Sequence, residues 1–135
     1  MTPPAENAAP PSKTILLVED DPTVCYFVER VLRNAGYYVG MAADGASGLR
    51  LFRVRPWDIV ITDRTMPGMN GEELAALIKK EAPEQPIVLI TGIPSRVERP
   101  ELFDAIFGKP FSITDLLAGL SALLQPRREG APLKT

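Results

Sequence analysis

Five short apolar runs restrict the fold of this chain more than any other feature of its sequence. They occupy residues 14–18, 37–42, 59–61, 86–90 and 105–107. Their length and their content of β-branched residues are typical of strands buried on both faces of a sheet. Strands that alternate with helices form a parallel sheet, because parallel neighbours need long crossover connections. The sequence therefore predicts an α/β fold, a doubly wound five-stranded parallel sheet with helices on both faces.

Four segments between and after these runs have the apolar spacing of amphipathic helices. The first follows Asp21, a helix N-cap before a proline, and the second is introduced by Asp44. The third is expected over residues 72–81, and its inward residues are Leu74, Leu77 and Ile78. The last is the clearest, and its inward face comprises Ile113, Leu116, Leu117, Leu120, Leu123 and Leu124.

Residues 93–103 occupy the place where the alternation calls for one more helix. The segment contains Pro94 and Pro100 and has little apolar periodicity. Proline in a helix interior removes a hydrogen bond and clashes with the preceding turn. The sequence therefore predicts a short, weak or irregular segment here.

The length and the ends of the chain predict one folded unit with two unstructured ends. A chain of 135 residues matches the usual size of one domain. Residues 1–12 contain four prolines and are expected to form a disordered arm, and residues 126–135 a flexible polar tail. The folded domain is expected over residues 13–125.

Composition excludes several classes of function. The chain contains no histidine, which excludes Ser-His-Asp and Cys-His catalysis and argues against a zinc site. A net charge of −2 predicts no nucleic-acid partner, and the apolar runs are too short to span a membrane. The first residues do not resemble a secretory signal. The single cysteine, Cys25, suits a reducing compartment, so we expect a cytoplasmic protein.

Polar residues with complementary chemistry follow four of the five predicted strands. Glu19 and Asp20 follow the first strand, Asp63 the third, Thr91 the fourth and Lys109 the fifth. The carboxyl ends of parallel strands meet at one edge of a sheet, where such folds bind ligands. Three neighbouring carboxylates repel one another, and a hard cation such as Mg²⁺ relieves this repulsion. With a lysine and a hydroxyl nearby, the set suits phosphoryl transfer to a carboxylate.

These residues stand in motifs that resemble the receiver domain of two-component response regulators. The matching motifs are ILLVEDD at 15–21, DRTMPGMNG at 63–71, Thr91-Gly92 and Lys109-Pro110. The resemblance covers roughly residues 13–124. It implies the flavodoxin-like (βα)5 receiver fold with strand order 2-1-3-4-5.

The resemblance also implies a role for each site residue. Asp63 would accept a phosphoryl group from a phosphohistidine on a sensor histidine kinase or a histidine phosphotransferase. Thr91 and Lys109 would hold the phosphoryl oxygens, and the Lys109–Pro110 peptide bond would be cis. Movement of Thr91 would bias a surface that binds an unknown downstream protein.

The implied cofactor is Mg²⁺. Asp20, Asp63 and the backbone carbonyl of Thr65 would bind the ion directly, and Glu19 would act through water. The implied chemistry is limited to the protein's own phosphorylation and dephosphorylation, so we do not expect an enzyme with an external substrate.

Three features depart from the usual family pattern. Glu19 replaces the first aspartate of the usual acid pair. Ile106 stands where the family has an aromatic residue, and strand alternation places Phe107 on the opposite face. Thr91 and Lys109 are 18 positions apart, which is closer than usual, and the missing residues fall in the segment over 93–103. We hypothesise that signalling runs through this remodelled segment.

Two other functions stay open beside a single-domain response regulator, which we expect to be a monomer or a weak homodimer. One is a phosphorylation-independent interaction module on a receiver scaffold, which the replacement by Ile106 favours. The other is a phosphatase with an aspartate nucleophile. Such enzymes have a second aspartate two residues after the first, whereas this chain has Thr65 there.

Overall fold

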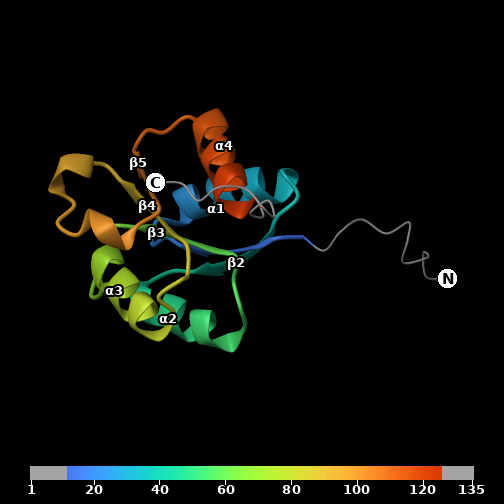
Figure 1. Ribbon diagram of the computed structural model, residues 1–135. Coiled ribbons are helices and arrows are strands. Elements are labelled where there is room, and N and C mark those ends of the chain that lie inside the picture. Colours follow the sequence, from blue (N-terminus) through green and yellow to red (C-terminus); the bar gives the residue numbers. More distant parts are fainter. Residues whose placement is uncertain (1–11, 126–135) are drawn as a thin grey trace, which may run out of the picture.

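The computed structural model describes residues 12–125, which form one five-stranded sheet with helices on both faces (Figure 1). All neighbouring strands are parallel, in the order β2-β1-β3-β4-β5. The strands are β1 (Thr14–Val18), β2 (Tyr38–Ala42), β3 (Ile59–Asp63), β4 (Ile87–Thr91) and β5 (Ala105–Gly108). The predicted fold class and strand order are confirmed. The predictions of a disordered arm and tail fall almost entirely on residues outside the described range.

Two pairs of helices cover the sheet. In Figure 1, α1 (Pro22–Asn34) and α4 (Ile113–Leu124) lie on one face, and α2 (Gly45–Val54) and α3 (Gly71–Glu81) lie on the other. Strand side chains alternate between the two apolar clusters, so that Ile15 belongs to the α1–α4 side and Leu16 to the α2–α3 side. This two-sided burial explains why the strands are continuous apolar runs.

Local polar signals set where the helices begin. The Asp21 carboxylate accepts the backbone N–H of Thr23 at the start of α1, and Asp44 accepts that of Ser47 at the start of α2. Asn70 and Glu73 form a reciprocal capping box on α3. The helices therefore start directly after the loops that leave the carboxyl ends of the strands.

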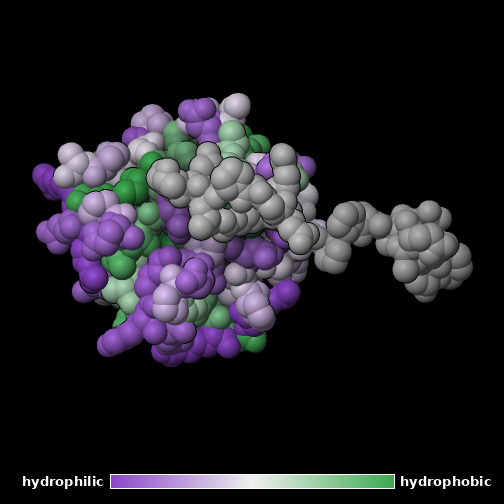
Figure 2. Space-filling model, in the orientation of Figure 1, coloured by the Kyte–Doolittle hydropathy of each residue, from purple (hydrophilic) through white to green (hydrophobic). Residues whose placement is uncertain are grey.

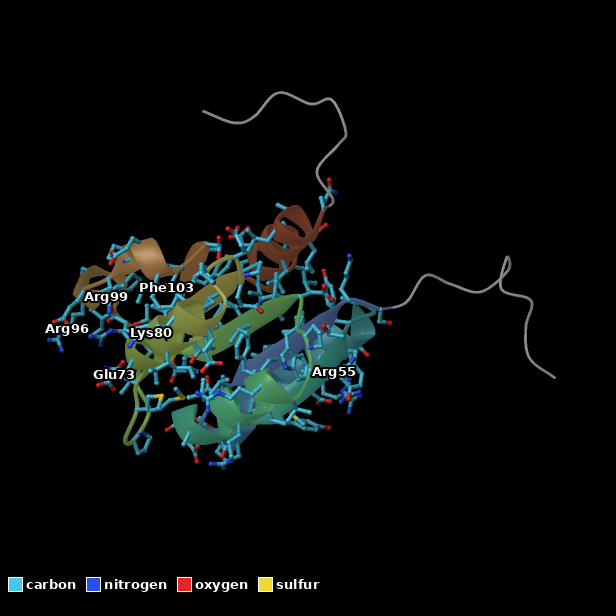
Figure 3. The ribbon with its side chains drawn as sticks, turned by 60° about the horizontal axis from the view of Figure 1, so that its bottom comes forward. Arg55, Glu73, Lys80, Arg96, Arg99 and Phe103 are labelled. Atoms are coloured by element: carbon cyan, nitrogen blue, oxygen red, sulfur yellow. The ribbon has the colours of Figure 1, made fainter. Side chains whose placement is uncertain are left out.

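The segment between β4 and β5 contains two short 3-10 turns, η2 (Pro94–Arg96) and η3 (Pro100–Leu102). Each turn begins at a proline, whose fixed φ suits the first position of a turn. The prediction of an irregular segment is confirmed. Figure 3 shows Arg96 and Arg99 reaching outward from this segment, and Arg99 lines one groove with Glu73 of α3.

One predicted core position is wrong. Leu77 was expected to face inward, but it is only half-buried and lines an open groove beside α3, whereas Ala75 is buried. Figure 2 shows hydrophilic surface over much of the α2–α3 side, with apolar patches between it and the rest of the molecule. Among residues 12–125, no helix combines the length and apolar character that crossing a membrane requires.

Candidate functional site

The acidic loop after β1 is held by its own hydrogen bonds. The backbone N–H of Glu19 donates to the Ala42 carbonyl at 3.0 Å, which extends the sheet by one residue. The Glu19 side chain is only 3% exposed, and its Oε2 accepts the backbone N–H of Asp21 at 3.1 Å. This loop therefore turns Glu19 inward, while Asp21 caps α1.

Asp63 is the last residue of β3, the central strand, and it is 7% exposed. The loop that follows returns close to it, since the Gly71 N–H donates to the Arg64 carbonyl at 2.8 Å. A Cβ on Gly71 would lie 2.3 Å from the Asp63 carbonyl oxygen. Only glycine allows α3 to begin so near the strand end, which encloses Asp63.

The structure brings together the three carboxylates that the sequence placed at strand ends. Ligand oxygens of Glu19, Asp20 and Asp63 all lie within 4.8 Å of one another. We call these three residues the acid cluster. The Lys109 ammonium lies 3.1 Å from Asp63 Oδ1 and 3.5 Å from Glu19 Oε1. Residues at the carboxyl ends of β1, β3 and β5 therefore meet at one point.

Thr91 is the last residue of β4 and lies beside the end of β5. Its carbonyl accepts the Lys109 backbone N–H at 2.8 Å, and the residue is 3% exposed. The Thr91 hydroxyl accepts the Ile93 N–H at 3.2 Å. Thr65 is exposed in the loop after β3, and the metal-binding role of its carbonyl stays a prediction. The Lys109–Pro110 bond is cis, as the resemblance implied.

The electrostatics of the acid cluster show a shortage of positive charge. Burial raises the pKa of Glu19 to about 7, and the neighbouring Asp63 charge adds to this effect. The Asp21 N–H and the Lys109 ammonium offset it only in part. Burial acts to lower the pKa of Lys109, but its contacts with Asp63 and Glu19 raise it overall. Lys109 therefore stays charged, and one ammonium faces three acids.

The acid cluster fits a hard divalent cation. Its donors are carboxylate oxygens, the ligands that Mg²⁺ prefers. Burial and the nearby Asp63 charge raise the pKa of Glu19, and a nearby cation would act in the opposite direction. A second positive centre beside Lys109 would remove this penalty.

The two residues near the end of β5 face opposite sides, as strand alternation predicted. Phe107 packs with the α1–α4 cluster, and a Cβ on Gly119 of α4 would lie 2.8 Å from Phe107 Cζ. Phe107 is thus committed to the core under α4 and does not replace an aromatic residue at position 106. Ile106 pairs with Leu89 of β4.

One polar residue near the site was not identified from the sequence. Glu72 in the first turn of α3 is buried, and it forms an ion pair with Arg64, the residue directly after Asp63. In the sequence, an acid in the first turn of a helix is a common feature that favours the helix dipole. No local pattern distinguished it from its exposed neighbour Glu73.

Comparisons with known proteins agree with this architecture. A family model described as the response regulator receiver domain matches residues 15–120. The response regulator receiver protein CpdR of Brucella abortus is 34% identical over 117 residues, which cover 83% of this chain and 97% of CpdR. The regulatory protein VanRB of Enterococcus faecalis is 36% identical over 124 residues, which cover 89% of this chain and 55% of VanRB. The chain thus spans nearly all of CpdR but about half of VanRB.

Solved structures with the same fold include two response regulators. The response regulator protein TrrA of Thermotoga maritima, solved in complex with Mg(2+)-BeF, gives a TM-score of 0.79 at 31% identity, covering 83% of this chain and 99% of TrrA. The chemotaxis protein CheY4 of Vibrio cholerae gives a TM-score of 0.78 at 28% identity, covering 84% of this chain and 100% of CheY4.

Proposed function

This chain belongs to the response regulator receiver domain family of two-component signalling, and we propose that it is a switch in which Asp63 accepts a phosphoryl group. The donor would be a phosphohistidine on a sensor histidine kinase or a histidine phosphotransferase. A carboxylate oxygen of Asp63 forms the new bond to phosphorus as the phosphorus–nitrogen bond breaks. The imidazole of the partner is the leaving group.

One observation carries this proposal: the Lys109 ammonium contacts Asp63 at 3.1 Å beside two further carboxylates. Phosphoryl transfer depends on positioning and on charge stabilisation more than on acid-base chemistry. Lys109 would neutralise one phosphoryl oxygen, and the Thr91 hydroxyl would donate to another. Both residues are held by the sheet, because the Lys109 N–H donates to the Thr91 carbonyl.

We also propose that the acid cluster holds Mg²⁺, with Asp20, Asp63 and the Thr65 carbonyl as direct ligands and Glu19 acting through water. When bound, Mg²⁺ offsets negative charge on the transferred phosphoryl oxygens. The close packing of the three carboxylates supports this assignment. TrrA, a similar receiver, was solved in complex with Mg(2+)-BeF.

The readout would run through the segment that replaces a helix after β4. Thr91 is buried, and its hydroxyl already accepts the Ile93 N–H. If that hydroxyl turns toward a phosphoryl group, the start of the segment must adjust. The protein would then signal in the cytoplasm through a downstream partner protein. Its catalysis would be limited to its own phosphorylation and dephosphorylation.

Intact-mass measurement with Mg²⁺ and acetyl phosphate tests the proposal. The wild-type protein should gain one phosphoryl group, and Asp63→Ala should gain none. A second control, Asp115→Ala, changes an exposed acid in α4 and should behave as wild type. Absence of a mass gain in the wild type, or an equal gain in Asp63→Ala, would contradict the proposal. It would favour the interaction-module alternative, which the replacement by Ile106 supports.

A further inference from the structure

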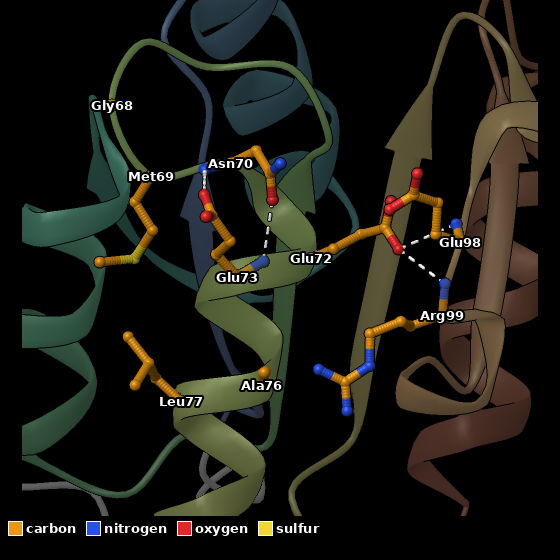
Figure 4. Close-up of a pocket in the computed structure, with 9 residues that line it drawn as sticks. All are labelled: Gly68, Met69, Asn70, Glu72, Glu73, Ala76, Leu77, Glu98 and Arg99. Carbon is orange, nitrogen blue, oxygen red and sulfur yellow. Dashed lines mark hydrogen bonds between the residues drawn. The ribbon is translucent and has the colours of Figure 1, made fainter.

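Glu72 makes an unusual set of contacts for an acid outside the acid cluster. It is 6% exposed, and its Oε2 accepts from Arg64 Nε at 2.8 Å. Its Oε1 accepts the backbone N–H groups of Glu98 and Arg99, at 3.0 and 2.7 Å. Figure 4 shows these two bonds crossing from α3 to the segment between β4 and β5. One carboxylate therefore joins three parts of the chain.

The carboxylate of Glu72 is charged and fully bonded in this position. Burial alone would raise its pKa, but the Arg64 guanidinium and the two backbone N–H groups lower it overall. Buried charges are stable only when they are paired and hydrogen-bonded. If Glu98 and Arg99 moved away, a buried anion would lose two of its donors.

The turn at 98–99 is joined to α3 by the two bonds to Glu72, and the η3 residues that follow it also contact α3. An open groove of about 580 Å³ lies between them, and the residues that line it include Leu77, Ala76 and Met69. Because this space is open, apolar packing does not fix the turn at that point. The Glu72 carboxylate bridges the gap.

The two halves of the segment are held very differently. After the turn, Leu102 is buried in the α2–α3 core, and Asp104 exchanges two hydrogen bonds with Ile87 at 2.9 and 2.8 Å. Before the turn, residues 92–96 are exposed, as residues 98–101 are, and the side chain of Pro94 lies beside Gly108 at the end of β5. The backbone bonds there are local, such as that from the Arg96 N–H to the Ile93 carbonyl.

We propose that Glu72 is an anchor that divides this segment into a fixed half, 98–104, and a responsive half, 92–97. This inference rests on the proposed function, because it states how far along the segment the structural change caused by phosphorylation of Asp63 extends. A change at Thr91 reaches Ile93 directly through the hydroxyl contact. It stops at Glu98, since further movement would unpair the buried carboxylate.

The other end of the anchor is built into the sheet edge. The Arg64 backbone N–H donates to the Ile90 carbonyl at 2.9 Å, so Arg64 is tied to β4 while its side chain holds Glu72. Through Arg64 and Glu72, the fixed half is thereby connected to the same strand ends that carry Asp63 and Thr91. The surface that changes would be limited to residues 92–97.

Residue-resolved amide hydrogen exchange of the full chain tests the anchor. In the unliganded protein, Glu72→Ala should speed exchange at Glu98 and Arg99 by roughly tenfold or more, because their acceptor is lost. Glu72→Gln keeps the shape of the side chain and should act in the same direction with a smaller effect. Glu101→Ala is the matched control, an exposed acid in the same segment that pairs with Arg99 at 3.5 Å, and it should leave both amides unchanged.

The second arm adds Mg²⁺ and beryllofluoride, a phosphoryl mimic. In the wild type, exchange should change at 92–97 and stay constant at 98–104, whereas in Glu72→Ala the change should spread into 98–104. An equal response of both halves in the wild type, or unchanged Glu98 and Arg99 amides in Glu72→Ala, would overturn the anchor. Fluorine NMR of the bound mimic reports on Asp63 separately. Failure to bind would count against the proposed function, while the unliganded arm would still decide the anchor.

Discussion

Two buried glutamates at the same edge of the sheet have opposite electrostatic situations. Glu19 in the acid cluster has its pKa raised to about 7, whereas the pKa of Glu72 lies below its ordinary value. Their exposed fractions are similar, 3% and 6%. Burial is the largest single influence on both pKa values; it prevails at Glu19, whereas the donors around Glu72 together outweigh it. Glu72 has a guanidinium and two backbone donors, whereas Glu19 has one backbone donor, the Asp21 N–H, and shares one ammonium with Asp63.

The difference separates a structural carboxylate from one suited to a ligand. A carboxylate whose acceptor positions are filled by the protein holds elements together. A carboxylate crowded by other acids stores repulsion that a cation can relieve. The same residue type therefore has two roles near Asp63. Glu72 is a fixed anchor, and Glu19 belongs to a candidate metal site.

The strongest test of this contrast removes the anchor. Glu72→Ala should lower the free energy of unfolding by about 3 kcal/mol, because it leaves Arg64 and two backbone donors without their acceptor. Urea denaturation of both proteins at pH 7 measures the difference. Glu101→Ala should stay within about 0.5 kcal/mol of wild type, as expected for an exposed acid. A loss as small as that of the control would show that Glu72 is not structural.

The acid cluster should instead give the protein an unusual dependence on pH. Because the folded-state pKa of Glu19 is raised to about 7 from 4.5, the folded state binds the proton more tightly than the unfolded state. This contribution is fully present below pH 4.5 and is lost as the pH rises through 7. Without Mg²⁺, stability should fall by about 2 kcal/mol between pH 5 and 8.

Thermal or urea unfolding in EDTA over this range provides the measurement, and Glu19→Gln provides the control. The variant lacks the titrating carboxyl group, so its stability should change much less with pH. Equal slopes for the two proteins would show that Glu19 is not the group responsible.

Magnesium should reverse the electrostatic penalty of the acid cluster. At a concentration ten times its dissociation constant, Mg²⁺ should raise the free energy of unfolding by about 1.4 kcal/mol through binding to the folded state. Asp20→Asn removes a proposed direct ligand and should reduce this gain at the same concentration. Glu72→Ala, although less stable, should keep the full increment. If Mg²⁺ stabilised neither the wild-type protein nor Glu72→Ala, the metal assignment would be wrong.

The smallest expected effect comes from relieving the repulsion without a metal. Asp63→Asn removes one of the three charges while keeping the size of the side chain, and it should stabilise the Mg²⁺-free protein by about 1 kcal/mol at pH 7. Lys109 keeps its contact with Glu19 in this variant. Denaturation in EDTA measures the change, and a destabilised variant would mean that the Lys109–Asp63 contact outweighs the repulsion.

The sequence was sufficient to predict the acid cluster because its members follow strands. Once β1, β3, β4 and β5 are parallel, their carboxyl ends must lie at one edge, and residues such as Asp63 and Lys109 must converge. Prolines 94 and 100 were likewise sufficient to predict a short, weak or irregular segment after β4, where the structure has two 3-10 turns. Side-chain alternation along the strand was sufficient to predict that Phe107 and Ile106 lie on opposite faces of the sheet.

The anchor and the exposure of Leu77 could not be predicted in the same way. Glu72 bonds to amides 26 and 27 residues further along the chain, and no local periodicity connects them. Leu77 has the spacing of a core residue, yet it lines the groove that the irregular segment leaves open beside α3. Both outcomes depend on where an irregular segment lies in space.

Local patterns by themselves thus determined the strands, the helices and the edge where the acids meet, since these follow from side-chain periodicity and the geometry of parallel connections. Only the tertiary structure decided which acids are satisfied. Glu19 and Glu72 are the same residue type in the sequence, and the burial of each side chain together with the number of donors that the folded chain brings to it sets their opposite pKa shifts. That number depends on contacts between distant segments, which local sequence does not encode.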